Sequence, residues 1–169
     1  MVYFIAAALL VALDQMVKLW TIATFSAPPP GTSETLDRAV SFLPNIMELT
    51  RIHNTGCAFS QLEEYTWLLT LTSAVLSAAL AWAVAKKFFR HPLGRSALTL
   101  VLAGAVGNLI DRAAYGYVVD MFRTLFMDFA VFNVADICVV VGGIAAAAYY
   151  LFLYDKLEGR ANEPTQADG

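Results

Sequence analysis

Three aspartates stand close together in the second half of this chain. Asp111, Asp120 and Asp136 lie in a sequence that is otherwise largely apolar. A carboxylate in or near a bilayer is costly unless it is paired or wetted, so each is a candidate functional group. Two carboxylates held close together share a proton, and one then acts as a base and the other as an acid near neutral pH. Such a pair can activate a water molecule to attack an amide carbonyl, which makes an aspartic hydrolase one interpretation of this spacing.

An apolar helix is expected to carry the first of these aspartates. Gly104, Gly107, Asn108, Asp111 and Arg112 follow the i, i+3, i+4, i+7, i+8 pattern and therefore share one helical face. Small residues on such a face let a neighbouring backbone approach closely. The alternative is a packing seam with one local Asp111–Arg112 pair, although a seam seldom needs three polar groups.

The other two aspartates are expected near the ends of helices. Gly116 can end the helix that carries Asp111, and Asp120 follows shortly after. Asn133 and Asp136 have the spacing of a capping box that opens the next helix, so a purely structural role stays open for Asp136. A short connection would bring Asp120 and Asp136 to the same end of two adjacent helices.

The composition indicates a membrane protein. Of the 169 residues, 59% are hydrophobic and 15% are charged, and the mean hydropathy of +0.60 is too apolar for a water-soluble surface. The net charge of −3 and the lack of a basic tail or of a Lys/Arg cluster typical of nucleic-acid binders argue against a nucleic-acid partner. Cys57 and Cys138 lie far apart and no CxxC or Cys/His ligand spacing is present, so we expect neither a zinc site nor a redox site.

The apolar runs predict one integral membrane domain of four transmembrane helices. These helices are expected at about residues 2–24, 65–85, 97–114 and 133–154. Residues 26–64 form a polar loop with a weak strand signal at 47–52, which predicts a small β element at the membrane surface. Residues 86–95 carry four Lys or Arg and no acid, so the positive-inside rule places this loop and both termini in the cytoplasm. The loops 26–64 and 115–132 are then extracytoplasmic, and 155–169 is a cytoplasmic tail with a disordered end.

Two charges interrupt the first apolar run. Asp14 and Lys18 are spaced i, i+4 and can pair across one turn, with the acid first. The pair is expected to face the interior of the bundle, where it either holds helices together or forms part of a proton relay.

Five motifs in this order resemble those of bacterial lipoprotein signal peptidase (signal peptidase II). They are Asp14-Gln15-x-x-Lys18, Asn54-Thr55-Gly56-Cys57-Ala58-Phe59-Ser60, Gly104-x-x-Gly107-Asn108-x-x-Asp111-Arg112, Val118-Val119-Asp120 and Phe132-Asn133-Val134-Ala135-Asp136. The resemblance implies an all-α membrane protein with four transmembrane helices and a small extracytoplasmic β cradle at the membrane surface. It also implies an aspartic endopeptidase of the bacterial cytoplasmic membrane, which cleaves diacylglyceryl-modified prolipoproteins just before the modified cysteine.

The resemblance also implies roles for particular residues. Asp120 and Asp136 match the catalytic dyad. The supporting residues match Asn54, Asn108, Asp111, Arg112, Asn133, Gly104, Asp14 and Lys18. Among these, Asn54, Asn108, Arg112 and Asn133 are expected to line the substrate site, while Asp14 and Lys18 help to hold the bundle. The family needs no metal or organic cofactor, acts in contact with membrane lipids, and is the target of the cyclic peptide globomycin; a monomer would suffice.

Three positions depart from the family pattern. Cys57 stands where Ala is usual and offers a thiol that can be modified. Met121 replaces a common Phe, and the Pro-rich segment 27–40 is longer than usual. Two other functions remain as alternatives: a small proton-coupled transporter that depends on Asp14 and Lys18, and a non-catalytic scaffold in which the acids are helix caps.

Overall fold

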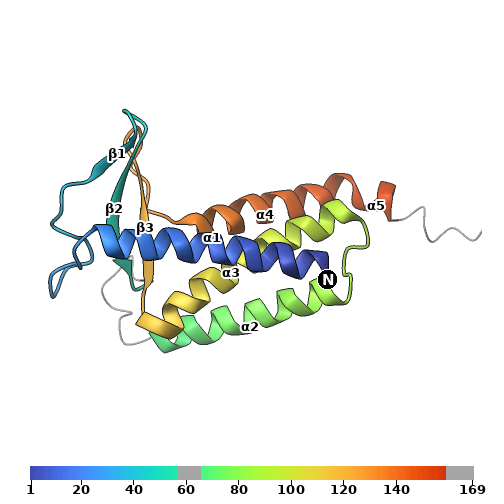
Figure 1. The fold of residues 1–169 in the computed structure, drawn as a ribbon. Coiled ribbons are helices and arrows are strands. Elements are labelled where there is room, and N and C mark those ends of the chain that lie inside the picture. Colours follow the sequence, from blue (N-terminus) through green and yellow to red (C-terminus); the bar gives the residue numbers. More distant parts are fainter. Residues whose placement is uncertain (57–65, 159–169) are drawn as a thin grey trace, which may run out of the picture.

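The structure is a computed structural model that describes residues 1–56 and 66–158. Four long helices lie side by side, and a three-stranded sheet crosses one end of the bundle (Figure 1). The predictions about Cys57 and about disorder at the end of the tail lie outside the described residues. All four helices are long and apolar enough to cross a membrane, which confirms the predicted fold class.

The helices occupy the four apolar runs. They are α1 (Val2–Thr24), α2 (Thr66–Ala85), α3 (Pro92–Tyr115) and α4 (Val134–Phe152), followed by the short α5 (Tyr154–Leu157). α3 begins at Pro92, five residues before the expected start at 97, because His91 caps its N-terminus and Pro92 suits the first helical turn. It ends at Gly116, whose positive φ of 79° is the left-handed conformation that closes many helices.

α3 is the central helix and contacts each of the other three long helices. Its tightest approach is to α4. A Cβ placed on Gly104 would lie 2.3 Å from the carbonyl oxygen of Ala135, so no larger residue fits there without moving the two backbones apart. The expected role of the glycine seam in close packing is therefore confirmed for Gly104.

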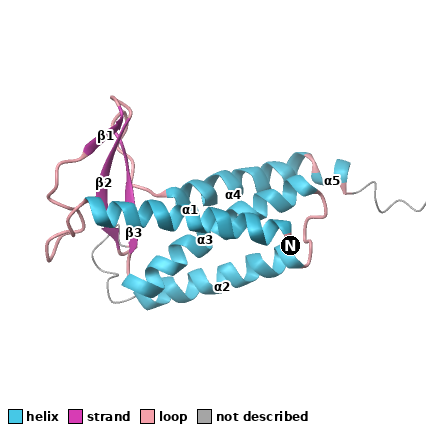
Figure 2. Cartoon of the chain, in the orientation of Figure 1, coloured by secondary structure: helices cyan, strands magenta, loops and turns pink. Residues whose placement is uncertain are grey.

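The sheet contains more of the chain than the weak strand signal predicted. Its order is β1 (Val40–Leu43), β2 (Met47–Asn54) and β3 (Val118–Thr124), all antiparallel. β3 comes from the connection between α3 and α4, so the sheet joins two distant parts of the sequence (Figure 2). Asp120 lies on β3 beside Ile52 of β2, which brings it back over the helical bundle.

The two faces of the sheet differ in polarity. Leu49 and Phe122 are register partners and belong to an apolar cluster with Phe25 at the end of α1. Glu48 and Arg123 are the adjacent partners, and the Arg123 Nη1 lies 3.2 Å from the Glu48 Oε1. Neighbouring residues at this end of the sheet therefore differ: Leu49 and Phe122 contact the apolar cluster, whereas Glu48 and Arg123 pair with each other.

Candidate active site

Asp120 is a buried carboxylate that two asparagine side chains hold in place. Its side chain is 1% exposed. Asn133 Nδ2 donates to Oδ1 at 2.7 Å, and Asn54 Nδ2 donates to Oδ2 at 2.8 Å. Burial raises the pKa of Asp120 to about 7; the hydrogen bonds from Asn54 and Asn133 act against this rise, while the neighbouring charge of Asp136 adds to it. Asp120 therefore exchanges a proton near neutral pH.

Asp136 opens α4 and faces the same asparagine. The capping box is present: Asn133 Oδ1 accepts from the backbone N–H of Asp136 at 2.9 Å, and Asp136 Oδ2 accepts from the backbone N–H of Asn133 at 3.1 Å. The other oxygen, Oδ1, accepts from Asn108 Nδ2 at 2.8 Å. Capping thus occupies one oxygen of Asp136, and the second belongs to the polar network around Asp120.

Asn133 connects the two carboxylates. Its side-chain nitrogen donates to Asp120 Oδ1 and, at 3.0 Å, to Asn108 Oδ1, while its side-chain oxygen serves Asp136. Every polar atom of this buried amide is used, so its orientation is fixed. Asp120 and Asp136 are therefore brought together through a residue that both contact.

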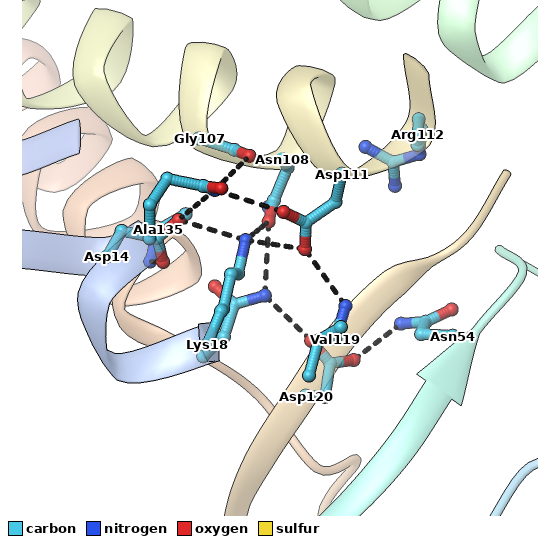
Figure 3. Close-up of polar contacts among 12 residues, drawn as sticks. Asp14, Lys18, Asn54, Gly107, Asn108, Asp111, Arg112, Val119, Asp120 and Ala135 are labelled. Atoms are coloured by element: carbon cyan, nitrogen blue, oxygen red, sulfur yellow. Dashed lines mark hydrogen bonds and ion pairs between the residues drawn. The ribbon is translucent and has the colours of Figure 1, made fainter. Parts of the chain in front are cut away.

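Lys18 of α1 extends this network. Among the described residues, it is the one buried cation in contact with these carboxylates and asparagines. Its Nζ is 2.9 Å from Asp14 Oδ2, 3.0 Å from Asp111 Oδ2 and 3.1 Å from Asn108 Oδ1 (Figure 3). The predicted Asp14–Lys18 pair is confirmed. Asp111, however, pairs with Lys18 of α1, and no ion pair between Asp111 and Arg112 is found among the described residues. The alternative of a local Asp111–Arg112 pair is therefore wrong.

The same buried carboxylates also hold the ends of other elements. Asp14 Oδ1 accepts from the backbone N–H of Ala135 at 2.8 Å, in the first turn of α4. Asp111 Oδ2 accepts from the backbone N–H of Val119 at 3.0 Å, at the start of β3. Each carboxylate satisfies a backbone donor that would otherwise be unpaired, and these contacts fix the segments that carry Asp136 and Asp120.

Gln15 belongs to a motif named from the sequence, but no site role was expected for it. Its Nε2 lies 3.0 Å from Asp111 Oδ1 and 3.2 Å from both Asp14 Oδ2 and the carbonyl oxygen of Gly107. Its place beside Asp14 in the sequence was the available signal, since both face α3. Gln15 adds a neutral donor where a second cation would be costly to bury.

Arg112 lies at the edge of the site. Its Nη1 is 3.4 Å from the hydroxyl oxygen of Ser73 on α2, and its side chain is only half-buried. Figure 3 draws no contact from this guanidinium to Asp111 or to Asp120. Among the described residues, the contact with Ser73 is the one hydrogen bond found for Arg112.

A second polar cluster ties the sheet to α1. Arg51 Nη1 donates to the carbonyl oxygens of Phe25 and Ile22, at 2.9 and 3.3 Å. Its Nε donates to His53 Nε2 at 3.2 Å, and the His53 ring stacks on Tyr117 with centroids 3.8 Å apart. Burial, together with the charge of Arg51, lowers the pKa of His53 to about 4, so the imidazole is neutral at pH 7.

A cavity of about 440 Å³ opens beside the carboxylates, and Asp136 and Asn54 are among its lining residues. No group of three His, Cys, Asp or Glu side chains arranged to hold a metal ion is found in residues 1–56 and 66–158. Fold and site together define a class: a multi-pass membrane protein with paired carboxylates at one end of its bundle, next to an apolar cavity.

Comparison with known proteins identifies the family. Residues 6–152 match the family model described as signal peptidase (SPase) II. The chain is 39% identical over 155 residues to a lipoprotein signal peptidase of Enterococcus faecalis, covering 92% of this chain and 90% of the relative. It is 40% identical over 144 residues to a lipoprotein signal peptidase of Symbiobacterium thermophilum, covering 84% and 89%. The chain belongs to the signal peptidase II family and is a membrane protease.

The fold agrees with solved structures. A bacterial membrane enzyme with a TM-score of 0.72 and 28% identity matches 89% of this chain and 93% of its own length. A second bacterial membrane enzyme has a TM-score of 0.68 and 26% identity, with coverage of 99% and 94%. The bundle and its crossing sheet are therefore shared with other bacterial membrane enzymes.

Proposed function

We propose that this protein is an aspartic endopeptidase that removes signal peptides from diacylglyceryl-modified prolipoproteins. It hydrolyses the peptide bond before the lipid-modified cysteine. The observation that carries the proposal is the pair Asp120 and Asp136, bridged by Asn133 at the edge of an apolar cavity. The relatives named lipoprotein signal peptidase support the choice of substrate.

The chemistry rests on one proton shared by the dyad. With the pKa of Asp120 at about 7 through burial, one carboxyl is protonated and the other ionised near neutral pH. The ionised carboxylate takes a proton from water as its oxygen bonds to the scissile carbonyl carbon. The protonated carboxyl donates to the carbonyl oxygen, which gives a neutral tetrahedral diol. Collapse of the diol breaks the C–N bond as the protonated carboxyl passes its proton to the leaving nitrogen and the ionised carboxylate takes a proton from a diol hydroxyl, which leaves a carboxylic acid and a free amine.

The asparagines keep the dyad oriented for this reaction. Asn54, Asn108 and Asn133 each donate to one of the two carboxylates, and each donor contacts a carboxylate oxygen at 2.8 Å or less. Carboxylate oxygens accept more than one hydrogen bond, so the dyad can also bind a water molecule. Because these amides stay neutral, they fix geometry without removing the proton that the reaction needs.

The remaining site residues are proposed to position the dyad or to contact the substrate. Lys18 offsets the charges of Asp14 and Asp111, which hold α4 and β3 respectively. Gly104 allows α3 and α4 to approach closely enough for Asn108 to reach the dyad. Arg112, at the edge of the site, is assigned to a substrate carbonyl.

The dyad is proposed to lie at the extracytoplasmic face of the bacterial cytoplasmic membrane. The basic loop between α2 and α3 is at the opposite end of the bundle from the sheet, as are the N-terminus and α5 (Figure 1). With that loop in the cytoplasm, both termini are cytoplasmic and the sheet is a cradle on the outer surface. There a water molecule can reach the scissile bond while the acyl chains stay in the bilayer.

The active form is proposed to be a monomer, because one integral peptidase domain contains every group that the reaction uses. A cyclic peptide such as globomycin would compete with the substrate for the dyad.

The test is cleavage of matched substrates by the purified protein in lipid nanodiscs. One prolipoprotein peptide carries a diacylglyceryl cysteine and a second carries the free cysteine. We expect mass spectrometry to find a new N-terminal diacylglyceryl cysteine from the first substrate and cleavage of the second to be at least about 100-fold slower. Cleavage at any other bond, or equal rates on both peptides, would overturn the proposal.

A further inference from the structure

The cavity beside the dyad is lined mostly by apolar residues. Asn54 and Asp136 are the polar and charged residues of its lining, and the other lining residues come from the β3–α4 connection and the first two turns of α4. These include Phe129 and Phe132 from the connection and Val140 from the helix. The cavity therefore joins a reactive carboxylate to a surface that favours hydrocarbon.

The α4 wall of the cavity belongs to the lipid-facing side of that helix. Ile137, Val140 and Val141 are 44%, 57% and 50% exposed. Cys138 and Gly142, on the other side of α4, are buried. Asp136 and Val140 are one turn apart on the same face, so the cavity runs from the carboxylate directly onto the surface that contacts the bilayer.

The part of the cavity lining that comes from the β3–α4 connection is aromatic, and hydrogen bonds to the sheet hold it in place. Phe132 and Phe122 exchange backbone hydrogen bonds of 2.8 and 3.1 Å, which extends the ladder of β3 to the residue before Asn133. Phe132 contacts Phe129 and Phe122, with ring centroids 6.0 and 5.7 Å apart. Phe122 also packs against the apolar cluster at the end of α1. The three rings thus form one aromatic row that joins the cavity lining to the apolar cluster under the sheet.

We propose that this cavity binds the acyl chains of the lipid-modified cysteine. The inference rests on the proposed function. In such a substrate the thioether sulfur is two bonds from the Cα whose nitrogen leaves, so the acyl chains must depart from the dyad within a few ångströms. The cavity is an apolar surface that includes Asp136 in its lining and shares the exposed residues Ile137, Val140 and Val141 with the outer face of α4. A lipid-anchored substrate can therefore reach the dyad without removing its chains from an apolar environment.

The experiment compares two acyl lengths in a cavity variant and a matched control. Val140→Trp fills the cavity wall, whereas Ile144→Trp places the same ring one turn further along the same exposed face, at a residue that does not line the cavity. Both substrates carry the same peptide, with either dipalmitoyl or diacetyl glyceryl on the cysteine. The readout is the ratio of kcat/KM for the long-chain to the short-chain substrate.

We expect Val140→Trp to lower this ratio about tenfold, since each methylene displaced from an apolar wall costs roughly a factor of four. Ile144→Trp is expected to leave the ratio within about twofold of the original. Circular dichroism and thermal unfolding of both variants verify that they fold, and a ratio within one folded variant is insensitive to the amount of active protein. A second arm cross-links a diazirine on the acyl chain of an uncleavable analogue, with label expected on Phe129, Phe132 or Val140.

Three results are distinguishable. If Val140→Trp slows both substrates equally, the cavity binds the apolar side chains of the signal peptide and the acyl assignment is wrong. If the ratio is unchanged and the label falls on other helices, the chains lie elsewhere although the protein is still a lipoprotein peptidase. If the unmodified protein cleaves neither substrate, the proposed function fails, and this inference fails with it.

Discussion

Replacing Asn54 by Leu should shift the pH dependence of the reaction. Asn54 donates to Asp120 Oδ2 at 2.8 Å, and this hydrogen bond stabilises the ionised form and so lowers the pKa of Asp120. A hydrogen bond to a charged group contributes about 1.5 kcal/mol at a partly exposed site. One pKa unit corresponds to about 1.4 kcal/mol, so its loss should raise the pKa of Asp120 by about one unit. The group would then lose its proton near pH ~8 instead of about 7.

The assay is kcat/KM as a function of pH, because this quantity reports the ionisation of the free enzyme. The dyad needs its shared proton, so kcat/KM should fall as the pH rises through about 7 in the original protein. In Asn54→Leu the fall should move to higher pH, whatever the loss in maximal rate. Asn54→Asp keeps an acceptor for the backbone N–H of Gly56 and adds a negative charge, so it should shift the fall at least as far. Ser41→Val, on the outer strand β1, is the control and should shift nothing. A fall that stays in place or moves to lower pH in both Asn54 variants would refute the assigned role of this hydrogen bond.

Three further predictions concern the support of the site. Lys18→Met leaves two buried carboxylates without their cation and should lower the free energy of unfolding in detergent by about 3–5 kcal/mol; a loss below about 1 kcal/mol would contradict the pairing. Gly104→Ala should cost about 1–3 kcal/mol and reduce turnover because its Cβ meets a backbone carbonyl of α4, whereas Gly143→Ala, with open space around it, should be neutral or slightly stabilising in the same thermal unfolding assay. Arg51→Gln should raise the pKa of His53 from about 4, because a neighbouring cation is removed, and NMR titration of the imidazole that shows no rise would refute the contact.

Much of the helical framework follows from the sequence. Apolar runs of about 20 residues must be helical in a bilayer, because no water is there to satisfy the backbone. The caps at Gly116 and Asn133 also follow from local residue types. The predicted start of α3 at residue 97 is too late. His91 and Pro92 were assigned to a loop, but they are the N-cap and the first residue of the helix.

The strands were harder to predict for a physical reason. Val118, Val119, Asp120 and Met121 are all buried, so β3 shows no alternation of polar and apolar residues. A helical period places Asp111 on a face of α3 but does not say which helix that face meets. The contact with Lys18, and the inclusion of Gln15, depend on the rotation of α1 against α3 and are visible only in three dimensions.

Cleavage by the two dyad variants tests the central claim most directly. Asp120→Asn and Asp136→Asn would each be purified beside the original protein, verified as folded by thermal unfolding, and given a diacylglyceryl-modified prolipoprotein. The account predicts that both bind the substrate and that both lose at least about 1,000-fold in kcat, because neither can share a proton with its partner carboxylate. Near-normal turnover by either folded variant would contradict the dyad and return Asp136 to the role of a helix cap.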